Sequence, residues 1–304
     1  MNKTTITITT LLALFPAVCY AQIYNDWERR DTIVTSMNEG TVKETDYAAQ
    51  GIFMDWSTVL DDFDEYDGDT TLDVIRAKVI PTKTEVTSLK GVTFTLPTLP
   101  DENGVDLFML TYEGIYIYMA MDEPVYFMEP EEDIIKWIRY YAYDKRTYTQ
   151  RIFNRYKNWE PLIKNYFRAM GIPEELAELC LVESGCTYEA ISSAGAVGMW
   201  QIMPDTGRSH GLKVNDKVDD RKDPVLSTQT AADILLSNYR ITGDWTLSAA
   251  AYNCGAGRVQ RHMIQGRNTW ETMKPNLPKE TRQYIPCLLA VHYVWTYRDR
   301  LGFD

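Results

Sequence analysis

Positive charge is scarce in this sequence, which has 31 Lys and Arg residues against 43 Asp and Glu residues and a net charge of −12. No block of Lys or Arg interrupts the acidic background. A chain with this balance repels a phosphate backbone, so we expect no nucleic-acid partner. At 304 residues, 45% of them hydrophobic, the chain is long enough for one large globular domain or two ordinary ones.

Repeats, low-complexity tracts and Pro/Gly-rich linkers are also missing. The N-terminal apolar stretch, Ile6–Val18, is too short and too rich in threonine for a membrane span. With Lys3 before it and Ala21 after it, this stretch predicts a signal peptide over residues 1–21 and therefore an exported protein. Lipid anchoring at Cys19 is the less favoured alternative, because Val18 precedes it where lipoprotein signals have a small residue.

Cysteine is sparse. Four cysteines remain once the predicted signal peptide is removed: Cys180, Cys186, Cys254 and Cys287. In an oxidising compartment they allow up to two disulfides. The sequence alone does not choose among the three full pairings.

The texture of the chain changes twice after the signal. Residues 22–66 are acidic and polar, whereas Thr70–Met128 is rich in β-branched and aromatic residues, as in Val92–Leu96 and Ile115–Tyr118, which predicts strands. Asp122–Pro124 predicts a turn.

A helical pattern follows Pro130. The acids Glu131–Asp133 precede an amphipathic run of Ile134, Ile135, Trp137 and Ile138, as at a helix N-terminus. We therefore predict an N-terminal module over residues 22–130, partly β and of unknown role, and a helical domain over residues 131–304.

The acid run Asp61–Asp69 resembles a calcium-binding loop only in composition. Aligning Gly68 with the invariant glycine of such loops puts Phe63 at the first ligand position and Val74 at the last. We expect a solvated turn here, and we predict no metal and no cofactor for the protein.

The segment from Pro173 to Gly185 predicts a short amphipathic helix with Glu183 on its buried stripe, at the spacing set by Leu176, Leu179 and Cys180. Burial and the negative end of the helix dipole both raise the pKa of a carboxyl at this position. A carboxylic acid that keeps its proton near neutral pH can protonate a glycosidic oxygen. The alternative is that Glu183 turns outward or pairs with an arginine.

Three further segments carry candidate site residues. Ser192–Gln201 is a run of small residues ending in Met199, Trp200 and Gln201, where an apolar sugar face and an amide that both donates and accepts are expected. An Ala-rich helix should end at Tyr252 and Asn253 before a glycine stop, and Pro286 should kink a helix just past Tyr284. Taken singly, each segment is also explained by ordinary packing.

Together these segments resemble the ordered motifs of soluble-type lytic transglycosylases, and most nearly the membrane-bound transglycosylase D-like branch of glycoside hydrolase family 23. The motifs are Glu183–Gly185, Gly198–Pro204, Ala251–Gly257 and Tyr284. The resemblance covers roughly residues 131–300. It implies an α+β protein, with a mostly helical, goose-lysozyme-like catalytic domain preceded by a small β-containing N-terminal module.

The resemblance implies that Glu183 protonates the bond between N-acetylmuramic acid and N-acetylglucosamine. The same carboxylate then deprotonates the muramic acid's own C6 hydroxyl, which gives a 1,6-anhydro sugar without water. Peptidoglycan glycan strands are the implied partner and the periplasm or cell envelope the implied location. We expect a monomer, with the N-terminal module as a candidate contact for an envelope protein.

The resemblance also assigns substrate-binding positions near the acid. They are Ser184, Ser192, Met199, Trp200, Gln201, Tyr252, Asn253 and Tyr284, of which Tyr252, Asn253 and Tyr284 frame and orient Glu183. The chain departs from the family pattern at Cys186, where an aromatic or aliphatic residue is usual, and at Ala256, where Pro is common. A disulfide between Cys186 and Cys254 is a hypothesis, since each lies near a motif.

Two rival functions remain open. A hydrolytic muramidase would pair Glu183 with a second carboxylate such as Asp220 or Asp223, although the acidic segment from Asp219 to Pro224 is expected to form a helix entry with local salt bridges. The second rival function is that of a non-catalytic wall-binding protein. A buried acid argues against it, because burying an ionisable group costs free energy and binding alone does not require one.

Overall fold

The computed structural model describes residues 5–7, 82–87, 93–98, 105–111, 114–116, 118–119, 131–264 and 268–303. Helices make up most of these residues, as the sequence predicts. The acid run at 61–69, the predicted turn at 122–124 and most of the predicted signal peptide lie outside the described residues.

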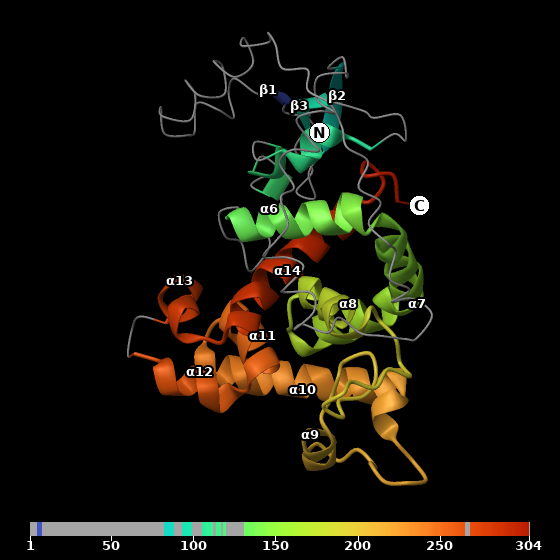
Figure 1. Cartoon of the computed structure of the whole chain (residues 1–304), viewed down its shortest axis with the longest axis vertical. Helices are drawn as coiled ribbons and strands as arrows, with labels where there is room; N and C mark the ends of the chain where they lie inside the picture. The colour runs from blue at the N-terminus through green and yellow to red at the C-terminus, as the bar shows by residue number, and fades with distance from the viewer. Residues whose placement is uncertain are drawn as a thin grey trace, which may run out of the picture.

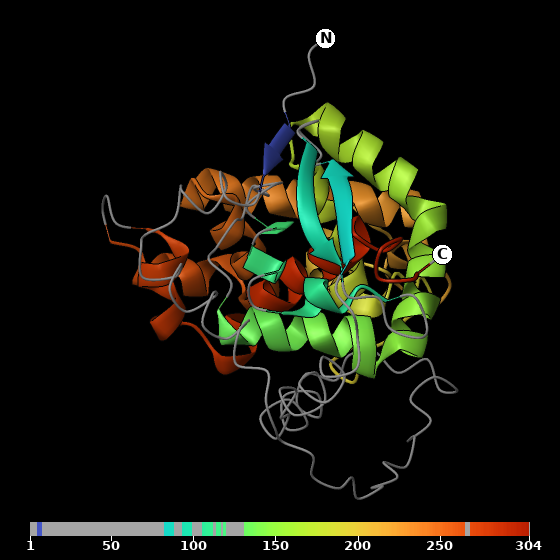
Figure 2. The same ribbon diagram turned by 90° about the horizontal axis from the view of Figure 1, so that it is seen from above.

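The described strands are β1 (Thr5–Thr7), β2 (Thr82–Thr87) and β3 (Thr93–Thr98), arranged in the order β1-β3-β2. β2 and β3 pair antiparallel and lie side by side in Figure 2, while β1 is parallel to β3. Because most of residues 22–130 is not described, the β-containing module as a whole stays a prediction. β1 falls within the predicted signal peptide and would be removed with it.

The strand predicted at Ile115–Tyr118 is wrong, because residues 114–116 and 118–119 are helical. Ile115 N donates to Thr111 O at 2.9 Å, and Gly114 N donates to Thr111 Oγ1 at 2.9 Å, so Thr111 caps the turn. Ile115 and Tyr118 are fully buried. Tertiary burial has overridden the β propensity of these residues.

Residues 105–111, 114–116 and 118–119 pack against the helices that follow residue 130. Val105, Leu107 and Ile115 belong to the same hydrophobic core as those helices. Tyr293 OH donates to Met109 O at 2.8 Å, and Arg300 Nη2 bonds Asp106 Oδ2 at 2.5 Å. This short segment is therefore part of the helical unit in its packing, although it precedes the change of texture at residue 130.

The helical unit contains several short helices and three long ones. Its elements are η1 (Leu107–Leu110), α6 (Glu132–Arg139), η2 (Tyr140–Asp144), α7 (Arg146–Met170), η3 (Glu174–Glu178), α8 (Leu179–Ser184), α9 (Pro204–Ser209), η4 (Asp220–Lys222), α10 (Pro224–Thr242), α11 (Trp245–Cys254), α12 (Ala256–His262), α13 (Trp270–Met273), η5 (Lys274–Asn276) and α14 (Lys279–Thr296). None of the described helices is long and apolar enough to cross a membrane.

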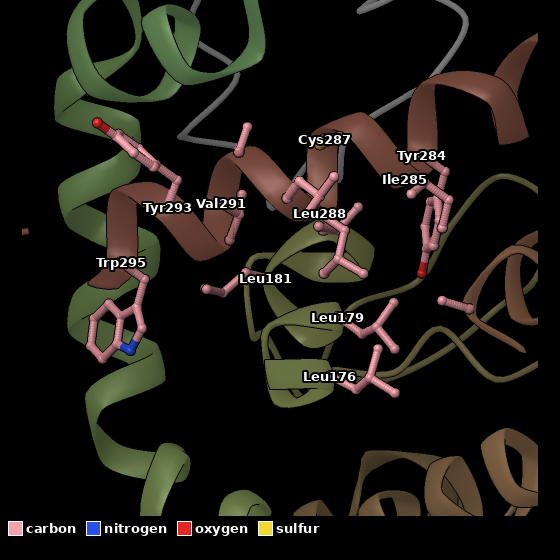
Figure 3. Close-up of a cluster of buried hydrophobic side chains, with 14 of the residues drawn as sticks. Leu176, Leu179, Leu181, Tyr284, Ile285, Cys287, Leu288, Val291, Tyr293 and Trp295 are labelled. Atoms are coloured by element: carbon pink, nitrogen blue, oxygen red, sulfur yellow. The ribbon is translucent and has the colours of Figure 1, made fainter. Parts of the chain in front are cut away.

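Helix α14 is the centre of the core. Figure 1 shows it passing behind α6, with α7 and α8 to one side and α11 to the other. The predicted stripe of α6 is buried against it, which confirms that part of the sequence reading. In Figure 3, Leu176 and Leu179 project toward Leu288 of α14, so the core fixes η3 and α8 relative to Tyr284. Helix α14 continues through Pro286 without ending.

Candidate active site

Helix α8 carries Glu183 in its last turn. Leu179 and Cys180 are fully buried, whereas Glu183 keeps partial exposure at the end of the same stripe. The helix ends at Gly185, whose φ is 56°, and Arg155 Nε donates to its carbonyl at 2.8 Å. A Cβ at Gly185 would lie 2.7 Å from Ile152 Cγ2, so glycine lets α7 approach this closely.

Tyr284 of α14 holds the Glu183 carboxylate directly. Its hydroxyl donates to Glu183 Oε1 at 2.6 Å. Burial raises the pKa of Glu183 to about 7, the hydrogen bond from Tyr284 lowers it, and the negative charge of Glu280 raises it further. The acid is therefore protonated in a large fraction of molecules near neutral pH, as the sequence analysis expected, and no arginine among the described residues pairs with it.

Glu178, the acid that ends η3, shows the opposite behaviour. Its side chain is fully buried. Burial alone would raise its pKa, but the neighbouring His292 and the positive charge of Lys164 bring the pKa below the ordinary value. Its oxygens lie 3.2 Å from Lys164 Nζ and 3.5 Å from His292 Nδ1. Two acids on one segment thus have pKa values shifted apart, which separates a structural carboxylate from a proton donor.

Tyr252 and Asn253 lie in the last turn of α11, and Tyr252 lies near Glu183. Tyr252 OH donates to Trp200 O at 2.7 Å, and burial near Glu183 raises its pKa well above the ordinary value, so the phenol keeps its proton. Asn253 Nδ2 donates to Glu280 Oε1 at 3.0 Å and its Oδ1 accepts from Thr281 Oγ1 at 2.7 Å. Asn253 thus orients Glu280 rather than Glu183 itself.

Sequence reasoning missed Glu280. It stands one helical turn before Tyr284 on α14, and a spacing of four residues puts two side chains on one face. The spacing of Glu280 and Tyr284 could have indicated that Glu280 lies near the site, but only after the contact between Tyr284 and Glu183 was known.

The loop between α8 and α9 is held by Arg221. Its Nη1 donates to the carbonyls of Gly195 and Ile202, each at 3.0 Å, and its guanidinium pairs with Asp219 at 2.8 Å. The expected salt-bridge role of this acidic segment is confirmed. At Gly198, a Cβ would lie 2.0 Å from Arg221 O, so no side chain fits.

Ser192 and Gln201 lie on this loop with partly exposed side chains. Ala196 N donates to Ser192 Oγ at 3.0 Å, and Gln201 Nε2 donates to Gly198 O at 2.8 Å. Gln201 has a φ of 47°, a left-handed conformation that is rare outside glycine and often found at functional sites. Ser192 Oγ and the Gln201 carboxamide oxygen are the groups here that remain suited to a ligand.

Met199 and Trp200 correct the sequence analysis. Both side chains are 0% exposed, and Trp200 Nε1 donates to Thr228 Oγ1 at 3.0 Å. They cannot line a sugar face in this conformation, because the loop folds them into the core. The exposed large apolar side chains of this loop are instead Tyr188, Ile191 and Met203, at 44%, 58% and 43%.

Ser184 is also committed within the protein. It is 5% exposed, its hydroxyl donates to Met199 O at 2.9 Å and accepts from Thr187 N at 2.9 Å. This arrangement favours a role in joining α8 to the following loop over a contact with substrate.

The carboxylates proposed for a hydrolytic rival are occupied elsewhere. Asp220 Oδ2 accepts from Lys213 N at 2.8 Å, and Asp223 Oδ1 accepts from Val225 N and Leu226 N as the cap of α10. Over the described ranges, no group of three His, Cys, Asp or Glu side chains is placed to hold a metal ion.

The cysteines do not follow the Cys186–Cys254 hypothesis. All four described cysteines are free thiols. The neighbours of Cys254 are Thr281, Arg258 and Glu280, whereas Cys186 lies against Cys180. The fold thus brings together two cysteines from either side of Gly185.

Comparisons with known proteins agree with this geometry. Residues 161–271 match the family model described as the transglycosylase SLT domain. The chain is 35% identical over 178 residues to the membrane-bound lytic murein transglycosylase D of Escherichia coli strain K12, which covers 57% of this chain and 39% of that protein. It is 29% identical over 137 residues to the peptidoglycan transglycosylase gp16 of Escherichia phage T7, covering 44% of this chain and 10% of that protein.

Among solved structures, an inactive mutant of lytic transglycosylase Slt from Pseudomonas aeruginosa matches with a TM-score of 0.40 and 21% identity, over 56% of this chain and 31% of that one. The matched segments span well under half the length of the curated relatives named above. Residues 161–271 of the chain are therefore similar to the transglycosylase SLT domain, and the chain resembles the membrane-bound lytic murein transglycosylase D.

Proposed function

We propose that this protein is a peptidoglycan lytic transglycosylase that cleaves the β-1,4 bond between N-acetylmuramic acid and N-acetylglucosamine. The observation that carries the proposal is the Glu183 carboxyl, with a pKa of about 7 and a 2.6 Å hydrogen bond from Tyr284. The SLT match supports the substrate class.

Glu183 acts first as an acid. Because Tyr284 donates to Oε1, the carboxyl proton is left on Oε2, from which it passes to the glycosidic oxygen as the bond breaks. The carboxylate that remains then takes the proton of the muramic acid C6 hydroxyl, whose oxygen attacks the anomeric carbon. The nucleophile belongs to the substrate, so no second carboxylate is needed.

The surrounding residues have distinct roles in this proposal. Tyr284, Tyr252 and Asn253 hold the acid and its neighbour Glu280, while Ser192 and Gln201 offer hydrogen bonds to the glycan. Exposed Tyr188 and Ile191 replace Met199 and Trp200 as the apolar surface for a sugar ring.

The broader arrangement is part of the same proposal. Residues 131–304 are the catalytic domain with a goose-lysozyme-like fold, against which the described residues between 105 and 119 pack, and the rest of residues 22–130 forms the N-terminal module that contacts wall or envelope protein. Residues 1–21 are removed on export to the periplasm or envelope, where the enzyme acts as a monomer on glycan strands.

The test is the product of digestion. We expect wild-type protein to release muropeptides lighter by one water at the muramic end, and Glu183→Gln to lower their release at least about 100-fold while still binding insoluble peptidoglycan. Mass spectrometry of the digest measures both. Exclusively reducing ends would identify a muramidase, and undiminished lysis by the variant would remove Glu183 from the reaction.

A further inference from the structure

Cys180 and Cys186 meet across the end of the helix that carries Glu183. Cys186 N donates to Cys180 O at 2.8 Å, and the Cys186 side chain is one of the groups that raise the pKa of the Cys180 thiol. Both side chains are buried, at 0% and 1% exposure. The backbone and the side chains therefore both bring these residues together.

The backbone turns sharply to achieve this. Gly185 and Cys186 both adopt left-handed conformations, with φ of 56° and 58°. Such a conformation is strained for a residue with a Cβ and persists only where the surroundings fix it. Here it reverses the chain and directs the Cys186 side chain back onto α8.

The other cysteines have different neighbours. Cys287 lies 3.2 Å from Tyr141 OH, and Cys254 stands near Thr281 at the end of α11. Of the four described cysteines, Cys180 and Cys186 are the pair held together by a backbone hydrogen bond and by an interaction between their side chains.

We propose that Cys180 and Cys186 form a disulfide that closes a short loop around Glu183. The oxidant is a disulfide of a protein or a small molecule. One cysteine thiolate attacks a sulfur of that oxidant and displaces its first thiol, and the second thiolate then displaces the other half. The pair loses two protons and two electrons, and the oxidant is reduced to two thiols.

Burial dictates when this step occurs. It raises the pKa of the Cys180 thiol well above the ordinary value, and neither sulfur is open to solvent. Exchange therefore takes place while the chain folds, before α8 closes, and the finished bond is shielded from reductants. The result is a structural bond that keeps the last turn of α8 from fraying at its acid.

Peptide mapping tests the pairing directly. The full chain is refolded in a buffer of oxidised and reduced glutathione, blocked with N-ethylmaleimide in denaturant, and cut by a glutamate-specific protease. Cleavage after Glu178, Glu183 and Glu189 separates the two cysteines. We expect Leu179–Glu183 and Ser184–Glu189 to remain linked until reduction. Blocked thiols at both positions, or a link from Cys186 to Cys254, would overturn the proposal.

Thermal unfolding gives a second readout. Reductant added during unfolding should lower the melting temperature of the oxidised wild type by roughly 5 °C and leave a Cys180→Ala/Cys186→Ala variant unchanged. A Cys254→Ala variant is the control and should keep the full loss. A wild type insensitive to reductant would count against the bond. Neither assay depends on export or catalysis, so a negative result would leave the proposed function untouched.

Discussion

Glu178 and Glu183 show how the same side chain takes two roles within one helical segment. Glu178 has Tyr156, Lys164 and His292 around it, so its buried charge is compensated. Glu183 has one neutral donor, Tyr284, and a negative neighbour, Glu280. The partners, and not the depth of burial, decide which acid is charged.

The raised pKa of Glu183 predicts a pH-dependent loss of stability. The folded state binds the proton up to about pH 7, whereas the unfolded chain releases it near its ordinary value of 4.5, so stability falls as the pH rises through this window. We expect Glu183→Gln to be more stable than wild type by about 1–2 kcal/mol at pH 8, after discounting for partial exposure.

Urea unfolding at pH 4 and pH 8 measures this effect, and the difference should largely vanish at pH 4. Glu178→Gln is the matched control. Its carboxyl has a lowered pKa, so its contribution is present above the ordinary value and the variant should lose stability at pH 8. A gap between Glu183→Gln and wild type that is constant across pH would contradict the assignment.

The two neighbours of Glu183 predict opposite shifts of the pH–rate profile. Activity requires the protonated acid, so kcat/KM should fall as the pH rises through about 7. Tyr284→Phe removes a hydrogen bond that lowers this pKa and should move the alkaline limb to higher pH. Glu280→Gln removes a charge that raises it and should move the limb to lower pH.

Steady-state digestion of soluble glycan across pH measures both profiles. Glu280→Gln also tests the rival hydrolysis, since Glu280 is the acid whose charge acts on Glu183. Anhydro products should persist in this variant. Shifts of both variants in the same direction would show that these contacts do not set the pKa.

At the scale of elements, the loop from Ser192 to Ile202 depends on space as well as on sequence. Gly195 and Gly198 have similar φ values, 86° and 83°. Only Gly198 faces a backbone oxygen, since a Cβ at that position would lie 2.0 Å from Arg221 O, whereas a Cβ at Gly195 would meet open space. An alanine would therefore meet the same backbone strain at both positions, but only at Gly198 would its Cβ also clash with a neighbouring atom.

This pair predicts unequal effects of alanine. Gly195→Ala should cost about 1 kcal/mol through strain alone. Gly198→Ala should cost about 2 kcal/mol more and lower activity, because Arg221 must move away from the loop that it anchors. Thermal unfolding and lytic assays of both variants measure the difference, and equal losses would rule out the close approach as the cause.

Several short helices were predictable because local pattern decides where they begin and end. The stripe of α6, the α8 helix ending at Gly185 and the Ala-rich α11 stopping at Gly255 follow the spacing and capping signals in the sequence. Residues 114–119 were mispredicted because their aromatic and β-branched side chains are buried by a partner, α14, that no local pattern indicates.

At the scale of the whole molecule, the described residues between 105 and 119 and the segment that follows α14 stabilise each other. Arg300 bridges to Asp106, and Tyr118 packs edge-on against Tyr297 with ring centroids 4.8 Å apart. We expect a chain shortened to residues 131–304 to melt at least about 10 °C below one that starts at residue 105.

Calorimetry of the two shortened chains measures this difference. An Asp106→Asn variant of the longer chain is the control for the ion pair alone, and it should fall between them. Equal melting temperatures would mean that the helical unit is complete without the segment.

The sequence by itself determined the helical character of residues 131–264 and 268–303 and the order of the motifs, and the family resemblance singled out Glu183 as the candidate acid. Helical character depends on periodicity and capping, which act over a few residues. The tertiary structure alone decided that Met199 and Trp200 face the core, that Glu280 acts on Glu183 and that Cys186 meets Cys180. The orientation and charge of side chains at a site are set by residues that other elements bring within a few ångströms. The separation of those residues along the sequence does not indicate that they will meet.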